Sequence, residues 1–362
     1  MASAPRQSLT DDAFRDARHA IEYCYAQGWT DGLPVIPPLQ EFVDDFLAQT
    51  GRDPDEVIMT VRHLDRSCTV RQAAINAVMA GCKSEYFPVV LAVVDGFAGG
   101  AGKITGLLQS TTGQAEVIIV NGPIRDRLGF NCKDNIFSPG DRPNATIGRA
   151  LRLIIMNALG IRPHVFDQST QGTPAKYSCC IAENEEDSPW EPLHAERGFS
   201  REASTATVQM VRGDLYVEHR MSQVPEELLL TIADSMSYAG AITQITDERI
   251  FHGAVVVMGP EHAQIIARRG WSKQDVKRFL WENFGKTKRD LRRFGKIARE
   301  LEDKPEDAFI ASGRSPDSIV LVVSGANNAG VSAVLPSITT TPPLGAMGRA
   351  LGSGTCEIVL KR

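Results

Sequence analysis

The order of the apolar segments most strongly constrains the fold of this chain. Each half shows the same predicted series of strand, helix, glycine, helix, strand and polar turn. In the first half the series occupies 57–61, 69–79, Gly81, 83–94 and 116–120. In the second half it occupies 254–258, a helix from Pro260, Gly270, 272–281 and 319–323. We therefore predict an α/β fold of two related mixed halves, with a cleft between them that suits a ligand.

Length and composition agree with a division into two domains. The chain has 362 residues, of which 43% are hydrophobic and 23% are charged, so it can bury a large core. We predict an N-terminal α/β domain with long polar loops over 1–203 and a C-terminal α/β domain over 204–362. In the second domain, strand-like runs at 205–211 and 215–219 flank Arg212-Gly213-Asp214 and predict a hairpin.

Charge and cysteine content narrow the class of protein. A net charge of −5 disfavours general binding to nucleic acid. The longest apolar stretch, 87–94, is too short for a membrane helix, and acidic residues stand where a signal peptide needs an apolar core. Seven cysteines without a Cys-x-x-Cys pair indicate a reducing compartment. We predict a cytoplasmic protein without a membrane partner, and we leave a homo-oligomer open.

The polar stretch 121–149 predicts a ligand site. A predicted strand ends at Asn121, and a long loop follows it. Asn144 is then expected to cap a helix that carries Arg149. The free N–H groups at the start of a helix attract anions, so Asn121, Asn144 and Arg149 are candidate ligands for an anionic group. The alternative is a surface loop with an ordinary helix cap. Asp31, in a stiff connector rich in glycine and proline, either fixes a turn or serves as a site carboxylate.

An acidic loop at 183–194 predicts acid–base chemistry. Glu183, Glu186 and His194 lie around a rigid Pro-Trp-Glu-Pro segment. Carboxylates that crowd one another raise one another's pKa, which suits a general acid. A hard metal ion is an alternative, but the spacing matches no strong ligand motif, so we assign no metal and leave cofactors unknown. The other alternative is an ordinary solvated loop.

Three further groups are weaker candidates. Cys82, at a predicted helix start, is either an acidified nucleophile or a buried packing residue. Thr111 and Thr112 precede a strand and either cap it or bind polar ligand atoms. His262 and Lys273 are expected at helix starts, where His262 serves as a neutral base or as a structural histidine.

The basic run 286–299 is interpreted as a solvated helix face, with an anionic partner as the alternative. Nucleotide-binding and serine-hydrolase motifs are not supported. Gly285-Lys286-Thr287 lacks the glycine that a phosphate loop needs at Leu280, and the chain contains no Gly-x-Ser-x-Gly element.

Taken together, these segments resemble a bacterial family related to selenoproteins with a Sec-Gly-Ser-Cys motif, known as the UGSC type. The segments that carry the resemblance are 31–38, 74–82, 121–124, 144–150, 185–192, 260–263 and 270–273. The Sec-Gly-Ser-Cys or Cys-Gly-Ser-Cys element itself is absent, and Gly352-Ser353-Gly354-Thr355-Cys356 is the nearest string. The resemblance names no reaction. It implies that any chalcogen chemistry would need a separate redox subunit or Cys82.

We expect an enzyme that acts on a small polar metabolite, with a carboxylated one favoured. The expected reaction is lyase-like acid–base cleavage of a carbon–heteroatom bond, with or without help from a thiol. One alternative is a thiol-redox or reductive-cleavage protein that works with a separate selenium- or sulfur-bearing subunit. The other is a non-catalytic anion-binding protein.

Overall fold

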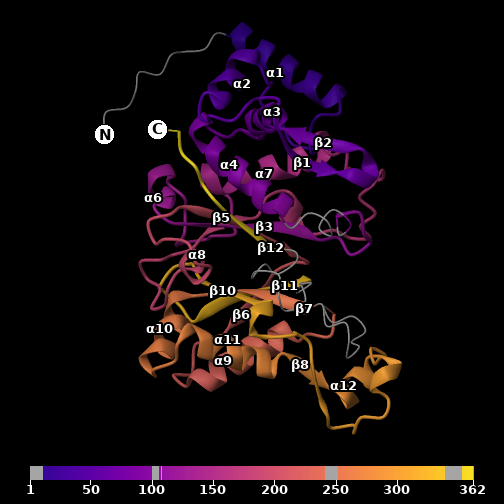
Figure 1. Cartoon of the computed structure of the whole chain (residues 1–362), viewed down its shortest axis with the longest axis vertical. Helices are drawn as coiled ribbons and strands as arrows, with labels where there is room; N and C mark the ends of the chain where they lie inside the picture. The colour runs from indigo at the N-terminus through magenta and orange to yellow at the C-terminus, as the bar shows by residue number, and fades with distance from the viewer. Residues whose placement is uncertain (1–10, 100–105, 107, 241–251, 339–352, 362) are drawn as a thin grey trace.

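The computed structural model describes residues 11–99, 106, 108–240, 252–338 and 353–361. Its elements form four layers, in the order helices, sheet, sheet and helices, along the long axis of the molecule (Figure 1). One outer layer contains α1 (Asp11–Ala26), α2 (Gln40–Leu47), α3 (Val70–Ala80), α4 (Phe87–Gly99) and α7 (Arg142–Asn157). The other contains α9 (Pro225–Met236), α10 (Pro260–Arg268) and α11 (Lys273–Asn283). The predicted α/β class is confirmed.

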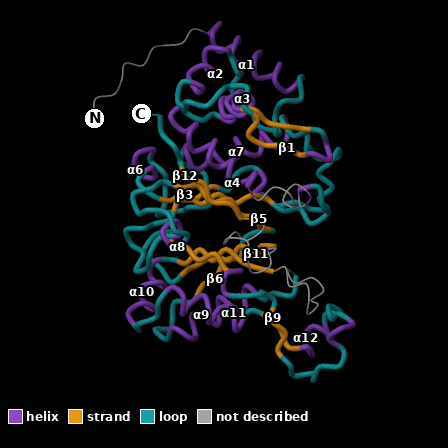
Figure 2. Tube along the Cα trace, in the orientation of Figure 1, coloured by secondary structure: helices purple, strands orange, loops and turns teal. Residues whose placement is uncertain are grey.

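Eight strands form one mixed sheet whose two halves lie face to face (Figure 2). The first half has the order β12 (Ser353–Glu357), β5 (Thr205–Val211), β3 (Ala115–Asn121) and β4 (Cys180–Ala182). The second half has the order β10 (Ile319–Val323), β7 (His252–Met258), β11 (Val331–Ile338) and β6 (Leu215–Glu218). Strand β3 is parallel to β4, and β7 is parallel to β10. The halves join where Ser337 of β11 pairs with Val211 of β5.

The alternation of side chains along the central strands explains the four layers. Val117 and Ile119 of β3 lie in one apolar cluster with Val255 and Val257 of β7, so the two sheet halves pack on each other. The intervening side chains of β3, such as Ile118, belong instead to the core beneath α3, α4 and α7. Ala254, Val256 and Met258 of β7 likewise belong to the core beneath α9, α10 and α11. Both faces of these strands are buried, as their nearly continuous apolar sequence requires.

Strand pairing corrects the predicted hairpin. Strands β5 and β6 do not pair with each other; β6 pairs with β11, and β5 pairs with β3 and β12. Both edges of β5 are therefore occupied along most of its length, and Arg212-Gly213-Asp214 links the two sheet halves instead. Because β5 and β12 complete the half that contains β3, the strand pairing does not divide at residue 203.

The two predicted repeats also differ in their first strand. Strand β1 (Val57–Val61) pairs with β2 (Arg66–Thr69) in a separate two-stranded ribbon, whereas β7 lies beside β10 in the main sheet. The expected basic helix is not continuous either. The run 286–299 comprises β8 (Gly285–Thr287), which pairs with β9 (Phe309–Ala311), then α12 (Lys288–Arg293) and a turn. Across the described residues, no helix combines the length and apolar character needed to cross a bilayer.

Two glycines allow α4 to lie directly on β12. A Cβ atom built on Gly354 would lie 1.8 Å from the carbonyl oxygen of Gly96, and a Cβ on Gly96 would lie 3.0 Å from the carbonyl oxygen of Gly354. Backbone therefore meets backbone at this point, and neither partner is a flexible side chain that can move aside. This contact fixes the distance between the helical layer and the first sheet half.

We predict that Gly354→Ala lowers the free energy of unfolding by about 1–3 kcal/mol or more, because the added methyl group forces α4 away from β12. Urea denaturation followed by circular dichroism measures this loss. Gly51→Ala is the matched control, since a Cβ there meets nothing within 4 Å. Equal stability of the two variants would contradict the close packing of α4 on β12.

Candidate functional site

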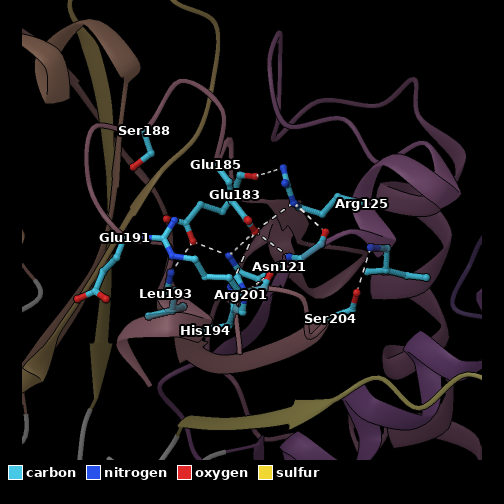
Figure 3. Close-up of polar contacts among 12 residues, drawn as sticks. Asn121, Arg125, Glu183, Glu185, Ser188, Glu191, Leu193, His194, Arg201 and Ser204 are labelled. Carbon is cyan, nitrogen blue, oxygen red and sulfur yellow. Dashed lines mark hydrogen bonds and ion pairs between the residues drawn. The ribbon is translucent and has the colours of Figure 1, made fainter. Parts of the chain in front are cut away.

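The candidate site lies where the parallel strands β3 and β4 end side by side. Asn121 is the last residue of β3, and Glu183 directly follows Ala182, the last residue of β4. Ligands of α/β proteins commonly bind at the carboxyl ends of parallel strands. The next residues of both segments, α6 (Ile124–Leu128) and α8 (Leu193–Glu196), add Arg125 and His194 (Figure 3).

Glu183 is the centre of this site and is fully buried. Its Oε2 atom accepts hydrogen bonds from Asn121 Nδ2 at 2.6 Å and from the backbone N–H of Leu193 at 2.9 Å. Its Oε1 atom is buried without a hydrogen-bond partner in the described part of the chain. Burial raises the pKa of Glu183 above its usual value, although the charge of Lys273 and the two hydrogen bonds oppose this effect. Because Oε2 faces two donors, a proton on this carboxyl group belongs on Oε1.

His194 is the second buried ionisable side chain of this site. Its Nε2 atom lies 3.3 Å from the carbonyl oxygen of Arg201, so we assign the ring proton to Nε2. The Nδ1 atom then carries a lone pair. It is buried without a hydrogen-bond partner among the described residues, and Oε1 of Glu185 lies 3.9 Å away. A neutral His194 can therefore accept a proton at Nδ1.

Arg125 holds the acidic loop in place. It donates to the carbonyl oxygens of Gly122 at 3.1 Å and Glu183 at 2.7 Å, and it pairs with Glu185 at 3.1 Å and Glu186 at 2.8 Å. The hydrogen bond from Arg125 lowers the pKa of Glu186. Glu185 also accepts from Gly122 N–H at 2.7 Å and from Asn121 Nδ2 at 3.1 Å. One buried guanidinium thus pairs with two carboxylates, which leaves these three side chains with one net negative charge.

The exposure of the acidic and histidine side chains decreases from the surface of the site to its interior. The side chain of Glu186 is 52% exposed, that of Glu185 is 16% exposed, and Glu183 and His194 are fully buried. The second half of the chain closes the inner end. Ser324, after β10, donates to the carbonyl oxygen of Ala182 at 2.7 Å, and the N–H of Asn184 donates to the carbonyl oxygen of Val323 at 2.8 Å. Exposure to solvent therefore falls from Glu186 through Glu185 to Glu183.

Four predicted site residues thus come together: Asn121, Glu183, Glu186 and His194. Sequence reasoning did not select Arg125 or Glu185. The signal for Glu185 was present, since it stands in the same acidic run. Arg125 follows Asn121 by four residues, on the first helical turn after β3, and only the fold shows that this turn faces the acidic loop.

Asn144 and Arg149, which were predicted to bind an anion, lie outside this cluster, and their side chains are engaged in contacts within the protein. Helix α7 begins at Arg142 because Pro143 suits its first turn, so Asn144 is inside the helix rather than its cap. The side chain of Asn144 instead bridges the backbone of Asn131 and Cys180. Arg149 makes two hydrogen bonds of 2.8 Å to Asp31, whose side chain is 4% exposed. These contacts indicate structural roles.

The surroundings of Cys82 do not favour a thiol of lowered pKa. Its backbone N–H donates to Ala77 at the carboxyl end of α3, where the helix dipole disfavours an anion. Regular α-helix resumes only at Phe87, after a short 3₁₀ turn over 84–86. Burial raises the pKa of Cys82 to about 12. The thiol chemistry considered from the sequence gains no support from this residue.

Of the remaining candidates, Lys273 lies against the acidic loop, where its Nζ atom donates to the carbonyl oxygen of Glu191 at 3.0 Å, and the others are dispersed. Thr111 and Thr112 are exposed at the start of β3, at the opposite end from Asn121. His262 is in the first turn of α10, as expected, and burial lowers its pKa; it contacts Ser332 at 2.8 Å and the carbonyl oxygen of His219 at 3.0 Å. Lys273 begins α11 and pairs with Glu196 of α8 at 2.8 Å. In the described ranges no group of three histidine, cysteine or acidic side chains is arranged to hold a metal ion.

We predict that Glu183→Gln stabilises the protein near neutral pH. Because the folded pKa is raised, the wild-type contribution is complete only below the unfolded glutamate pKa of about 4.3, and it is lost as the pH rises through the folded value. Glutamine mimics the protonated carboxyl group, so the melting temperature should exceed that of wild type at pH 8 and converge with it near pH 4. Differential scanning calorimetry across this range checks the sign, with Glu22→Gln on the exposed face of α1 as control. A constant difference at all pH values would argue against a raised pKa.

We predict that Arg149→Ala acts on stability. Removing the guanidinium leaves the Asp31 carboxylate buried and unpaired, which costs about 3 kcal/mol. Urea denaturation measures the loss. The Asp31→Ala and Arg149→Ala double variant should recover part of it, because the uncompensated charge is then gone. A loss below about 1 kcal/mol in the single variant would contradict this structural role.

A scan against protein-family models finds no match, and a search of curated proteins finds none either. The resemblance to UGSC-type proteins therefore stays a prediction from the sequence motifs.

Proposed function

We propose that this chain is an enzyme that cleaves a carbon–heteroatom bond in a small polar metabolite by acid–base chemistry. The observation that carries the proposal is the pair of buried atoms Glu183 Oε1 and His194 Nδ1, each without a partner in the described structure. Burial favours the protonated form of Glu183, while the contact at Nε2 leaves His194 Nδ1 as an acceptor. One acid and one base in a single buried site suit an elimination.

The proposed step removes the elements H and X from adjacent carbon atoms. His194 Nδ1 accepts the proton from the C–H carbon, the electron pair of that bond forms the new C=C bond, and the C–X bond breaks. Glu183 Oε1 donates its proton to the leaving group X, which departs as HX. The resulting imidazolium and carboxylate return to their starting forms by proton transfer through the solvent-facing side of Glu185.

The charges around the site limit which substituent on the substrate the site can accommodate. Arg125 pairs with two carboxylates, Glu185 and Glu186, so these three side chains carry one net negative charge, while Lys273, whose charge acts on Glu183, is paired with Glu196. This balance favours a hydroxyl or amino group as the reacting substituent. The carboxylated substrate expected from Asn144 and Arg149 loses that support, because both side chains are engaged in structural contacts. Entry of a substrate requires Glu185 to move away from His194.

We predict that substitutions of Glu183 and His194 have different effects on the rates of C–H exchange and of elimination. Small β-hydroxy and β-amino metabolites are incubated with the protein in D₂O and followed by proton NMR. His194→Gln should abolish both C–H exchange and elimination, because it removes the base. Glu183→Gln should slow elimination about 100-fold or more but leave C–H exchange, because it removes only the acid. Glu22→Gln, an exposed carboxylate substitution on α1, should match wild type. Full elimination activity in Glu183→Gln would overturn the assignment.

A further inference from the structure

A cavity separate from the Glu183 site lies beside α7 and the segment 163–177. Its volume is about 500 Å³, within the usual range for sites that bind small molecules. The lining combines charged and apolar side chains, among them Arg152, Met156, Asp167, Pro174, Lys176 and Tyr177. The proposed reaction uses none of these residues.

The charged wall of the cavity is built from buried groups. The side chains of Arg152 and Asp167 are 5% and 3% exposed, and they pair at 2.9 Å. Lys176, 15% exposed, places its Nζ atom 2.7 Å from Asp167 and 2.7 Å from Ser169 Oγ. Burial alone would raise the pKa of Asp167, but hydrogen bonds from Lys176, Ser169 and Arg152 hold that pKa well below its usual range. Asp167 is therefore a fixed anion between two cations.

The charges of this wall sum to one excess cation. Arg152 and Lys176 carry two positive charges, and Asp167 carries one negative charge. Asp31 also lines the cavity, but Arg149 balances it through a bidentate pair. Behind the wall, burial raises the pKa of Glu116, and the charges of Arg152 and Lys176 oppose this effect. An ammonium group has three N–H donors, and Lys176 uses two of them on Asp167 and Ser169. Its third donor is left for a ligand.

Part of the cavity lining is suited to an apolar body. Met156, Pro163 and Pro174 form it, together with the ring of Tyr177, which is 55% exposed. Flat and aliphatic surfaces of this kind bind apolar ligand groups, while a few fixed polar groups orient the ligand. A phosphate ester would bring two negative charges to a wall with one in excess. A single carboxylate matches the charge.

We propose that this cavity is a binding site for a small carboxylate with an aromatic or apolar body, whose carboxylate accepts a hydrogen bond from Lys176. The nearby Arg152 and Asp167 hold the ammonium group in position. The site is independent of the elimination chemistry at Glu183, since Asn121 and Glu183 lie at the carboxyl ends of β3 and β4 and line no part of this cavity.

Titration calorimetry with sodium benzoate and with the uncharged isostere benzamide tests this proposal on the whole chain. Wild type should bind one benzoate, at least tenfold more tightly than benzamide. Lys176→Met should weaken benzoate about tenfold or more and leave benzamide unchanged, while Lys176→Arg should restore most of the affinity. Lys83→Met, at an exposed lysine outside the cavity, and Glu183→Gln should both bind benzoate with the wild-type affinity.

A second variant keeps the test decisive if Lys176→Met does not fold. Thr173→Trp leaves all the charges in place but fills the cavity, so it should abolish benzoate binding. The proposal is overturned if wild type binds no benzoate at millimolar concentration, if benzamide binds equally well, or if Thr173→Trp retains the wild-type affinity. Because Glu183→Gln serves as a separate arm, failure of the elimination proposal would not be confused with failure of this one.

Discussion

The apolar layer between the two sheet halves is the interaction on which the rest of the molecule depends. Strands β3 and β4 supply its one side, and β7, β10 and β11 supply the other. Because the outer faces of the same strands are buried under helices, these strands accept few polar side chains along their middle. The polar side chains lie instead at the ends of the strands and in the loops that follow them. The cluster of Asn121, Glu183 and His194 lies at such an end.

The buried charges of this protein follow two different schemes. In one scheme a carboxylate stays ionised because cations contact it directly, as Arg149 does for Asp31 and Lys176 does for Asp167. In the other, Glu183 has only neutral donors within hydrogen-bonding distance, and burial therefore favours its protonated form. Arg125 forms ion pairs with Glu185 and Glu186, but it contacts Glu183 only at the backbone carbonyl oxygen. The carboxyl group of Glu183 therefore has no direct ion pair with Arg125. This difference supports a structural role for Asp31 and a chemical role for Glu183.

Much of the fold could be predicted from the sequence because its signals are local. Apolar runs located β3, β7 and β10, and the capping boxes at Thr69 and Ser272 begin α3 and α11 close to where the patterns placed them. The strand partners could not be predicted in the same way. The choice of β11 rather than β5 for β6 depends on which edge is free, and that is a property of the whole sheet. The site shows the same limit: the acidic loop, Asn121 and a buried Cys82 as one alternative could be predicted, but the pairing of Arg149 with Asp31, 118 residues away, could not.

The position of β12 has a consequence for how the molecule assembles. Thr355 of this strand contacts Thr207 of β5 across 148 residues of sequence. The sheet half that carries β3 therefore keeps an unpaired strand edge on the ribosome until synthesis has passed residue 357. Contacts of such long sequence separation form slowly, since a large loop must close before they are gained. During this interval the exposed edge of β5 is a surface on which a chaperone could act, and on which nascent chains could pair with one another.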